Sequence, residues 1–189
     1  MKYISTRGNT EEKRSAQAII EGLAPDKGLY VPKEMPHINL HLDFERLVGA
    51  SYRETARLIL GAFLDDFTED ELAFCVNGAY DEKFDTPQIA PLAFTKKAAF
   101  LELYHGRTAA FKDMALSILP YLLTTSLRKE HEDNKIVILT ATSGDTGKAA
   151  LEGFADVSGT EIIVFYPKDG VSAIQERQMV TQRGVNTHV

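Results

Sequence analysis

The sequence predicts an α/β protein that begins with a mainly helical part and continues into a layered domain with a parallel sheet. Two observations carry this prediction. Up to about residue 92 the recognisable segments have helical periodicity, whereas from about residue 97 short apolar strand candidates alternate with helix candidates. Such alternation is typical of parallel βαβ units. We therefore expect two domains, formed by residues 1–92 and residues 93–189.

The first part holds three predicted helices. Residues 15–23 form a short amphipathic candidate, and a connection rich in proline and glycine follows at residues 24–32. Ser51 and Glu54 have the spacing of a capping box, in which each side chain accepts a hydrogen bond from the other residue's backbone. Apolar residues then recur at helical spacing as far as Leu64. A second capping box at residues 68–71 predicts another helix that runs toward Tyr80.

The second part alternates between strands and helices. Pro120 lies inside a predicted helix and should kink or break it, because proline lacks a backbone N–H and clashes with the preceding turn. Pro167 ends a strand, and Ser172 caps the next helix. The predicted elements are a strand at 98–104, a helix at 114–127, a strand at 135–139, a helix at 146–155, a strand at 161–166, a helix at 173–182, and a turn with the start of a strand at 184–189.

Composition excludes several classes of protein. The net charge is −6 and no run of Lys or Arg forms a basic stripe, so we expect no nucleic-acid partner. The longest apolar run, residues 58–64, is too short to span a bilayer, and the first residues lack the apolar core of a secretory signal. The single cysteine, Cys75, excludes an internal disulfide and fits a reducing cytoplasm. It lies in an apolar helical stretch, where we expect it to be buried and not catalytic.

The histidines do not predict a metal site. His37 and His41 are four residues apart with Asp43 nearby, but Pro36 precedes them and no helix is established there. A surface loop explains these residues better than a metal centre, and we expect no bound metal. The spacing of the Ser, His, Asp and Glu residues along the sequence predicts neither a Ser-His-Asp triad nor a catalytic pair of carboxylates.

Residues 105–113 place one lysine between a loop of small residues and an apolar run that predicts a helix. Lysine forms reversible Schiff bases with aldehydes, and it does so best when burial or a positive helix end lowers its pKa. Ala110 and Phe111 can shield Lys112, and a following helix would place its N-terminus nearby. The alternative is an ordinary solvated lysine in the first turn of a helix.

A second loop, Thr-Ala-Thr-Ser-Gly-Asp-Thr-Gly at residues 140–147, lies between a predicted strand and a predicted helix. Hydroxyl groups and backbone N–H groups at a helix N-terminus can bind an anion, and open α/β sheets place ligands at the carboxyl ends of their strands. The loop is not a nucleotide-binding P-loop, because Thr142 and Ala149 occupy positions that require Gly and Ser/Thr. The alternative is a plain capped turn.

These two loops, with four further segments, resemble threonine synthase. The further segments are the opening at residues 3–8, residues 21–32, the pair Tyr166-Pro167, and residues 172–179. They cover essentially the whole chain in the order found in that family. The resemblance implies a pyridoxal-phosphate enzyme with the tryptophan-synthase β-type, three-layer fold (fold type II). It also implies a lyase that converts O-phosphohomoserine and water to L-threonine and phosphate, the last step of threonine biosynthesis.

The resemblance also implies roles for individual residues. Lys112 would be the catalytic Schiff-base lysine that holds pyridoxal 5′-phosphate and then moves protons on the substrate. Asp145 would lie beside the 3′-oxygen of the cofactor. The residues expected to grip the substrate carboxylate are Thr142, Ser143, Gly144 and Thr146. His105 would either shape the lysine loop or contact substrate.

Two positions depart from the commoner family pattern. Arg107 and Ala173 stand where many members have proline, and neither change removes a reacting group. Arg107 would either rest in solvent or help to attract phosphate.

The resemblance further implies that part of the enzyme lies beyond Val189. The family's glycine-rich cup for the cofactor phosphate and its partner for the pyridine nitrogen follow the last residue of this chain. We therefore expect an N-terminal fragment of a cytoplasmic enzyme that binds the cofactor weakly and has little turnover alone. Its oligomeric state is not predicted. A non-catalytic α/β binding module stays open as an alternative, and so does a threonine or serine dehydratase of the same fold type.

Overall fold

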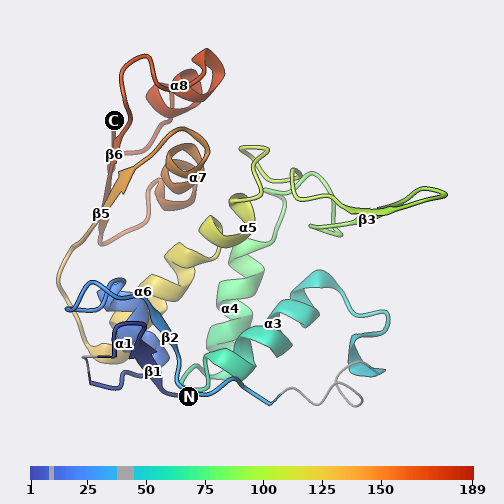
Figure 1. Cartoon of the computed structure of the whole chain (residues 1–189), viewed down its shortest axis with the longest axis vertical. Helices are drawn as coiled ribbons and strands as arrows, with labels where there is room; N and C mark the ends of the chain where they lie inside the picture. The colour runs from blue at the N-terminus through green and yellow to red at the C-terminus, as the bar shows by residue number, and fades with distance from the viewer. Residues whose placement is uncertain (9–10, 38–44) are drawn as a thin grey trace. The chain divides into compact units, whose positions relative to one another are not determined.

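A computed structural model describes residues 1–8, 11–37 and 45–189. Figure 1 traces the chain by residue number. The chain forms two compact units that interleave along the sequence. The first contains residues 1–78 and 121–133, and the second contains residues 79–120 and 134–189. The boundary between residues 92 and 93 stays a prediction, because units of dense packing are not the same as domains.

The first unit contains the helices that the sequence predicts. Its elements are β1 (Tyr3–Ser5), α1 (Ser15–Glu21), β2 (Tyr30–Pro32), α3 (Tyr52–Phe63), α4 (Glu69–Ala79), which ends at the edge of the unit, and most of α6 (Leu119–Glu130). Strands β1 and β2 pair antiparallel with Ile4 opposite Val31. The sequence pattern predicts only a connection at residues 24–32, because a strand of three residues is too short to show alternation.

Both predicted capping boxes are confirmed. At α3 the N–H of Ser51 donates to Glu54 Oε2 over 2.7 Å, and the N–H of Glu54 donates to Ser51 Oγ over 3.3 Å. The equivalent bonds at α4 join Thr68 and Glu71 over 2.8 and 3.2 Å. Each box satisfies backbone donors that would otherwise lack a partner in the first turn. These local signals explain why both helix starts are predictable from sequence.

Cys75 lies in the core of the first unit, as predicted. Its side chain is fully buried, and its sulfur lies 3.5 Å from Thr125 Oγ1 of α6. Burial raises the pKa of the Cys75 thiol. A buried thiol with a raised pKa is a poor nucleophile, so Cys75 acts as a small apolar packing residue.

The parallel sheet of the second unit is confirmed. Its elements are β5 (Ile136–Ala141), α7 (Asp145–Phe154), β6 (Thr160–Phe165), α8 (Ala173–Val180) and β7 (Thr187–His188), with strand order β5-β6-β7. Strands β5 and β6 pair in register from Ile136↔Thr160 to Ala141↔Phe165. Helix α7 packs on β6 and buries Leu151 and Phe154 completely. The strand that begins near residue 184 is the short β7, which pairs parallel with β6.

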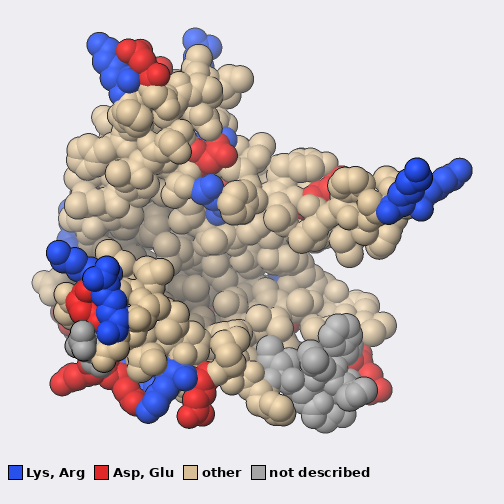
Figure 2. Space-filling view, in the orientation of Figure 1, with Lys and Arg blue, Asp and Glu red and all other residues tan. Residues whose placement is uncertain are grey.

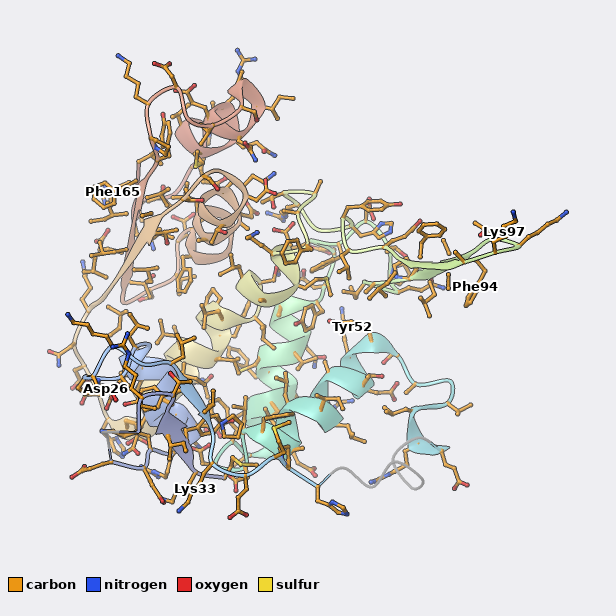
Figure 3. All side chains as sticks on the ribbon, in the orientation of Figure 1. Asp26, Lys33, Tyr52, Phe94, Lys97 and Phe165 are labelled. Carbon is orange, nitrogen blue, oxygen red and sulfur yellow. The ribbon has the colours of Figure 1, made fainter. Side chains whose placement is uncertain are left out.

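The predicted strand at 98–104 is only partly correct. The structure has a strand β4 at Ala99–Leu101, and it pairs antiparallel with β3 (Leu92–Phe94) in a separate sheet of two strands. It does not belong to the parallel sheet. An apolar run indicates a strand but not its partner, and the turn at Lys96 and Lys97 closes a hairpin with the preceding segment. Figure 3 labels Phe94 and Lys97 on this hairpin.

The predicted helix at 114–127 is broken as Pro120 suggests. Helix α5 covers only Asp113–Leu116, and α6 begins at Leu119. Pro120 is then the second residue of α6, where its missing N–H needs no partner within the helix. The break makes α5 a short helix of its own, separate from α6.

Helix α7 packs directly on the end of α5. A Cβ atom added at Gly153 would overlap the carbonyl oxygen of Leu116, which is backbone and cannot rotate away. Only glycine permits this approach. Since α5 follows the lysine loop and α7 follows the second loop, the contact fixes the two loops relative to each other within the second unit.

The contact at Gly153 predicts a stability change. We expect Gly153→Ala to lower the midpoint of urea unfolding, at a cost of about 1–3 kcal/mol, because the added methyl forces the helices apart. Gly61→Ala in α3 is the matched control. Its Cβ would lie 3.4 Å from the flexible Leu72 side chain, so alanine should be neutral or gain up to about 1 kcal/mol of helix propensity. A Gly153→Ala chain as stable as the Gly61→Ala chain would contradict this packing.

Candidate active site

Lys112 lies at the start of α5, where its carbonyl oxygen accepts hydrogen bonds from the N–H groups of Ala115 and Leu116. Its side chain is half-buried, and its ammonium lies 4.3 Å from the centre of the Phe111 ring. Ala110 is buried, but the Phe111 ring is itself 60% exposed. No carboxylate among residues 1–8, 11–37 and 45–189 forms an ion pair with this lysine. Lys112 is therefore a half-buried amine that forms no ion pair with any of the described residues.

Asp113 holds the lysine loop in its shape. Its buried carboxylate accepts two hydrogen bonds from Thr108, one from the backbone N–H over 2.9 Å and one from the hydroxyl over 2.6 Å. Gly106 lies against this carboxylate so closely that a Cβ atom would overlap it. Ala109 adopts φ = 55°, a conformation that few residues other than glycine accept. The sequence motifs predict no role for Asp113. An acid directly after the lysine and five residues from Thr108 could have indicated a hydrogen bond that closes the loop.

His105 lies at the start of the lysine loop and contacts two acids and a tyrosine. Its Nδ1 lies 2.5 Å from Asp85 Oδ1, its Nε2 lies 2.9 Å from Glu102 Oε2, and its ring stacks on Tyr104. The hydrogen bond to Glu102, with that to Asp85, raises the pKa of His105 above its usual value of 6.5. A histidine between two acids is favoured in its protonated form. Whether it also contacts substrate stays a prediction.

The second loop is folded around Thr142. The N–H of this residue donates to the carbonyl of Phe165 in β6 over 2.9 Å. Its Oγ1 accepts hydrogen bonds from the N–H groups of Gly144 and Gly147, each over 3.0 Å. Gly144 adopts φ = 139°, which favours glycine. Thr142 is thus buried in the turn, whereas Ser143 is exposed and Thr146 is half-exposed.

Asp145 begins α7 and faces positive charge. Its Oδ1 accepts a hydrogen bond from Gln175 Nε2 over 2.9 Å and lies 3.2 Å from Lys148 Nζ. The Gln175 hydrogen bond, the Lys148 contact and the charge of Lys112 together lower the pKa of Asp145. Lys112 precedes α5 and Asp145 begins α7, and these two helices pack on each other at Leu116 and Gly153, so the two predicted loops belong to the same part of the second unit.

Arg107 connects the lysine loop to α7. Its Nη1 donates to Glu152 Oε1 over 2.9 Å, and Gln182 donates to the other oxygen of Glu152. The arginine side chain is 56% exposed, so this surface pair contributes at most about 1 kcal/mol. A role for Arg107 in attracting phosphate stays a prediction.

The remaining candidates carry no catalytic arrangement. His37 is exposed, and His41 and Asp43 lie outside the described residues. Within those residues no group of three or more His, Cys, Asp or Glu could hold a metal ion, and no helix there has the length and apolarity to cross a bilayer. On the face shown in Figure 2, Lys and Arg occur in small separate groups, several of them beside Asp or Glu.

The chain is similar to known sequences over its whole length. Residues 2–80 match the family described as "Threonine synthase N terminus". Over its whole length the chain is 38% identical to threonine synthase from Pseudomonas aeruginosa and 34% identical to that from Schizosaccharomyces pombe, of which it covers 40% and 38%. It is also 36% identical over 97% of its length to human threonine synthase-like 1, of which it covers 26%.

Solved structures give the same result. A threonine synthase from Brucella melitensis with bound pyridoxal phosphate matches 95% of the chain at 36% identity and a TM-score of 0.85. Yeast threonine synthase matches the whole chain at 30% identity and a TM-score of 0.89. This chain covers 38% and 40% of those two proteins, so it spans about two fifths of the length of the threonine synthases it matches. The resemblance to their N-terminal portion and the predicted α/β fold are both confirmed.

The His105 cluster gives a pH-dependent prediction. The folded pKa of His105 lies above the unfolded value of about 6.5, so its two contacts stabilise the fold fully below pH 6.5. That contribution is lost as pH rises through the folded pKa. Titration of the imidazole by NMR should show Glu102→Gln lowering the pKa of His105 more than Asp85→Asn does.

Glu82→Gln is the control for this titration, because Glu82 is an exposed acid of the same unit. It should leave the pKa of His105 unchanged. A wild-type His105 that titrates at or below pH 6.5 would refute the ion-pair assignment.

Proposed function

We propose that this chain, which is similar over its whole length to the N-terminal two fifths of threonine synthases, is that part of a pyridoxal-phosphate-dependent threonine synthase. The complete enzyme would convert O-phosphohomoserine and water to L-threonine and phosphate. The observation that supports the proposal is the packing of α5 on α7, the two helices that follow the Lys112 loop and the loop at residues 142–147. Among the described residues, Lys112 forms no ion pair.

The residues present fit pyridoxal phosphate. The cofactor aldehyde needs a primary amine, and in the part of the chain that the structure describes no carboxylate forms an ion pair with Lys112. The cofactor also needs a polar group beside its 3′-oxygen, and Asp145 begins α7, the helix that packs on α5. When bound, the cofactor supplies an aldehyde that forms Schiff bases with amines and a ring that withdraws electrons.

Lys112 would have two tasks in this reaction. Its amine would first hold the cofactor, and after the substrate amine replaces it, the free amine would move protons at the α-carbon and the β-carbon of the substrate. The contact with the Phe111 ring would support both tasks by restricting the lysine side chain. The Asp113–Thr108 bonds would keep the lysine in register with the second loop.

The second loop would bind the substrate carboxylate. Gly144 and Gly147 already donate their N–H groups to Thr142, so Thr142 would act mainly by holding the turn closed and by offering its hydroxyl proton. Ser143 and Thr146 would supply hydroxyl groups, and Gly144 would serve by letting the turn close against the Gln175 amide. The positive end of α7 favours a carboxylate at this position.

Turnover would require more than this chain. The threonine synthases that it matches are about two and a half times as long, and we propose that the groups holding the cofactor phosphate and ring nitrogen lie in the part that is not matched. A buried, unpaired Cys75 is consistent with the reducing cytoplasm in which we place the enzyme. A threonine or serine dehydratase is disfavoured by the segments at residues 3–8 and 175–179, which follow the threonine synthase pattern.

The assignment of Lys112 can be tested by trapping. Pyridoxal phosphate added to the chain should give the visible absorbance of a Schiff base, and reduction with borohydride should leave the pyridoxyl group on Lys112, as read by peptide mass spectrometry. Lys112→Ala should lose at least about 90% of both signals. Lys168→Ala, which removes an exposed lysine of the same unit, should change neither.

Two results would reject the assignment of Lys112. One is a label spread evenly over exposed lysines, and the other is absorbance that survives in Lys112→Ala. Either result would favour the alternative of a non-catalytic α/β module.

A further inference from the structure

Gln175 makes contacts at both ends of its side-chain amide. Its Oε1 accepts hydrogen bonds from the N–H of Ser172 over 3.1 Å and from the hydroxyl of Ser172 over 3.0 Å. Its Nε2 donates to Asp145 Oδ1 over 2.9 Å. The bond from the Ser172 N–H, with the bond from the Gln175 N–H to Ser172 Oγ over 3.3 Å, forms the capping box of α8. The bond to Asp145 reaches the first residue of α7 (Figure 1).

The partners leave one orientation for this amide. A backbone N–H can only donate, so the group facing Ser172 must be the Gln175 carbonyl. An ionised carboxylate can only accept, so the group facing Asp145 must be the amide NH₂. Glutamate, the commoner residue at this position of a capping box, would satisfy Ser172 but could not donate to Asp145.

Gln175 also closes the turn before α7. A Cβ atom at Gly144 would lie 2.5–2.7 Å from the amide atoms of Gln175, so the glutamine packs directly on the glycine. The φ of 139° at Gly144 and this contact require glycine independently. The side chain of Gln175 therefore touches two consecutive residues of the loop at 142–147.

We propose that Gln175 is a positioning residue that fixes the Asp145 carboxylate and the Gly144 turn by joining the start of α8 to the start of α7. The bearing of this role on catalysis rests on the proposed function, in which Asp145 faces the cofactor. The hydrogen-bond relay from Ser172 through Gln175 to Asp145 does not depend on that function and is testable in the chain alone.

The charges around Asp145 make the relay measurable. Asp145 faces the amide of Gln175 from α8, the ammonium of Lys148 within α7, and the charge of Lys112 at the start of α5. The Gln175 bond is the largest of the causes that lower the pKa of Asp145. This group therefore stabilises the fold above its usual pKa of 3.8, and the contribution is lost as pH falls through its folded pKa.

The test is a titration of the Asp145 carboxyl carbon by NMR in the chain without cofactor, together with the three-bond couplings that report its χ1 rotamer. Gln175→Glu keeps the capping box but loses the donor, and it should raise the pKa of Asp145 by about one unit. Gln175→Met removes the amide without adding charge. It should raise the pKa less and average the χ1 couplings, because no group then holds the carboxylate.

Ser172→Ala is the matched control. It removes the cap hydroxyl, but the Ser172 backbone N–H still holds Gln175. We expect the first turn of α8 to exchange its amide protons faster while the pKa and rotamer of Asp145 stay as in wild type. If Gln175→Glu and Gln175→Met leave both the pKa and the rotamer of Asp145 unchanged, the positioning role is wrong.

The two proposals fail separately. If Lys112 forms no Schiff base but Asp145 responds to the Gln175 variants as described, the proposed function fails and the relay stands. If Lys112 is labelled as in wild type while the pKa and the rotamer of Asp145 stay unchanged in both Gln175 variants, the relay fails and the proposed function stands. Should Gln175→Glu not fold, Gln175→Met still tests the relay, because its side chain nearly conserves the volume of glutamine.

Discussion

The close approach of α7 to the backbone of α5 is the constraint on which the candidate site depends. Gly153 of α7 meets the carbonyl oxygen of Leu116, and no side chain fits between them. Each helix follows a loop that carries candidate chemistry: Lys112 directly precedes α5, and residues 142–144 lead into Asp145 and Thr146 at the start of α7. A contact between two backbones fixes those loops more rigidly than a contact between flexible side chains could.

Each loop is then held by one polar side chain that satisfies backbone donors. Asp113 accepts from Thr108 in the lysine loop, and Thr142 accepts from Gly144 and Gly147 in the second loop. Buried donors without partners are costly, so such side chains select one loop conformation among many. Gln175 extends the same principle between elements by connecting the cap of α8 to Asp145. The candidate site is thus formed by the first residues of α5 and α7. Close packing at glycine residues and hydrogen bonds from polar side chains set the orientation of these residues.

Local signals in the sequence predicted much of this fold. The capping boxes at Ser51 and Thr68, the break near Pro120 and the strands of the parallel sheet depend on nearby residues, and all are present. The strand expected at residues 98–104 does not join the parallel sheet, because β4 pairs instead with β3, a three-residue strand too short to be recognised from alternation. The roles of Asp113 and Gln175 were not predicted, since each depends on which groups the folded chain brings together. The motifs named Lys112 and the second loop, but only the folded chain brings the two together.

The convergence of the two loops can be measured directly. A nitroxide label on Ser143→Cys, in a Cys75→Ser background, reports on nearby amides through paramagnetic broadening in NMR spectra, with a diamagnetic label as reference. Ser143 is exposed and therefore accepts the label without repacking. We predict strong broadening of the amide signals of Lys112 and its loop. If those signals keep the intensity seen with the diamagnetic label, the two loops do not form one site.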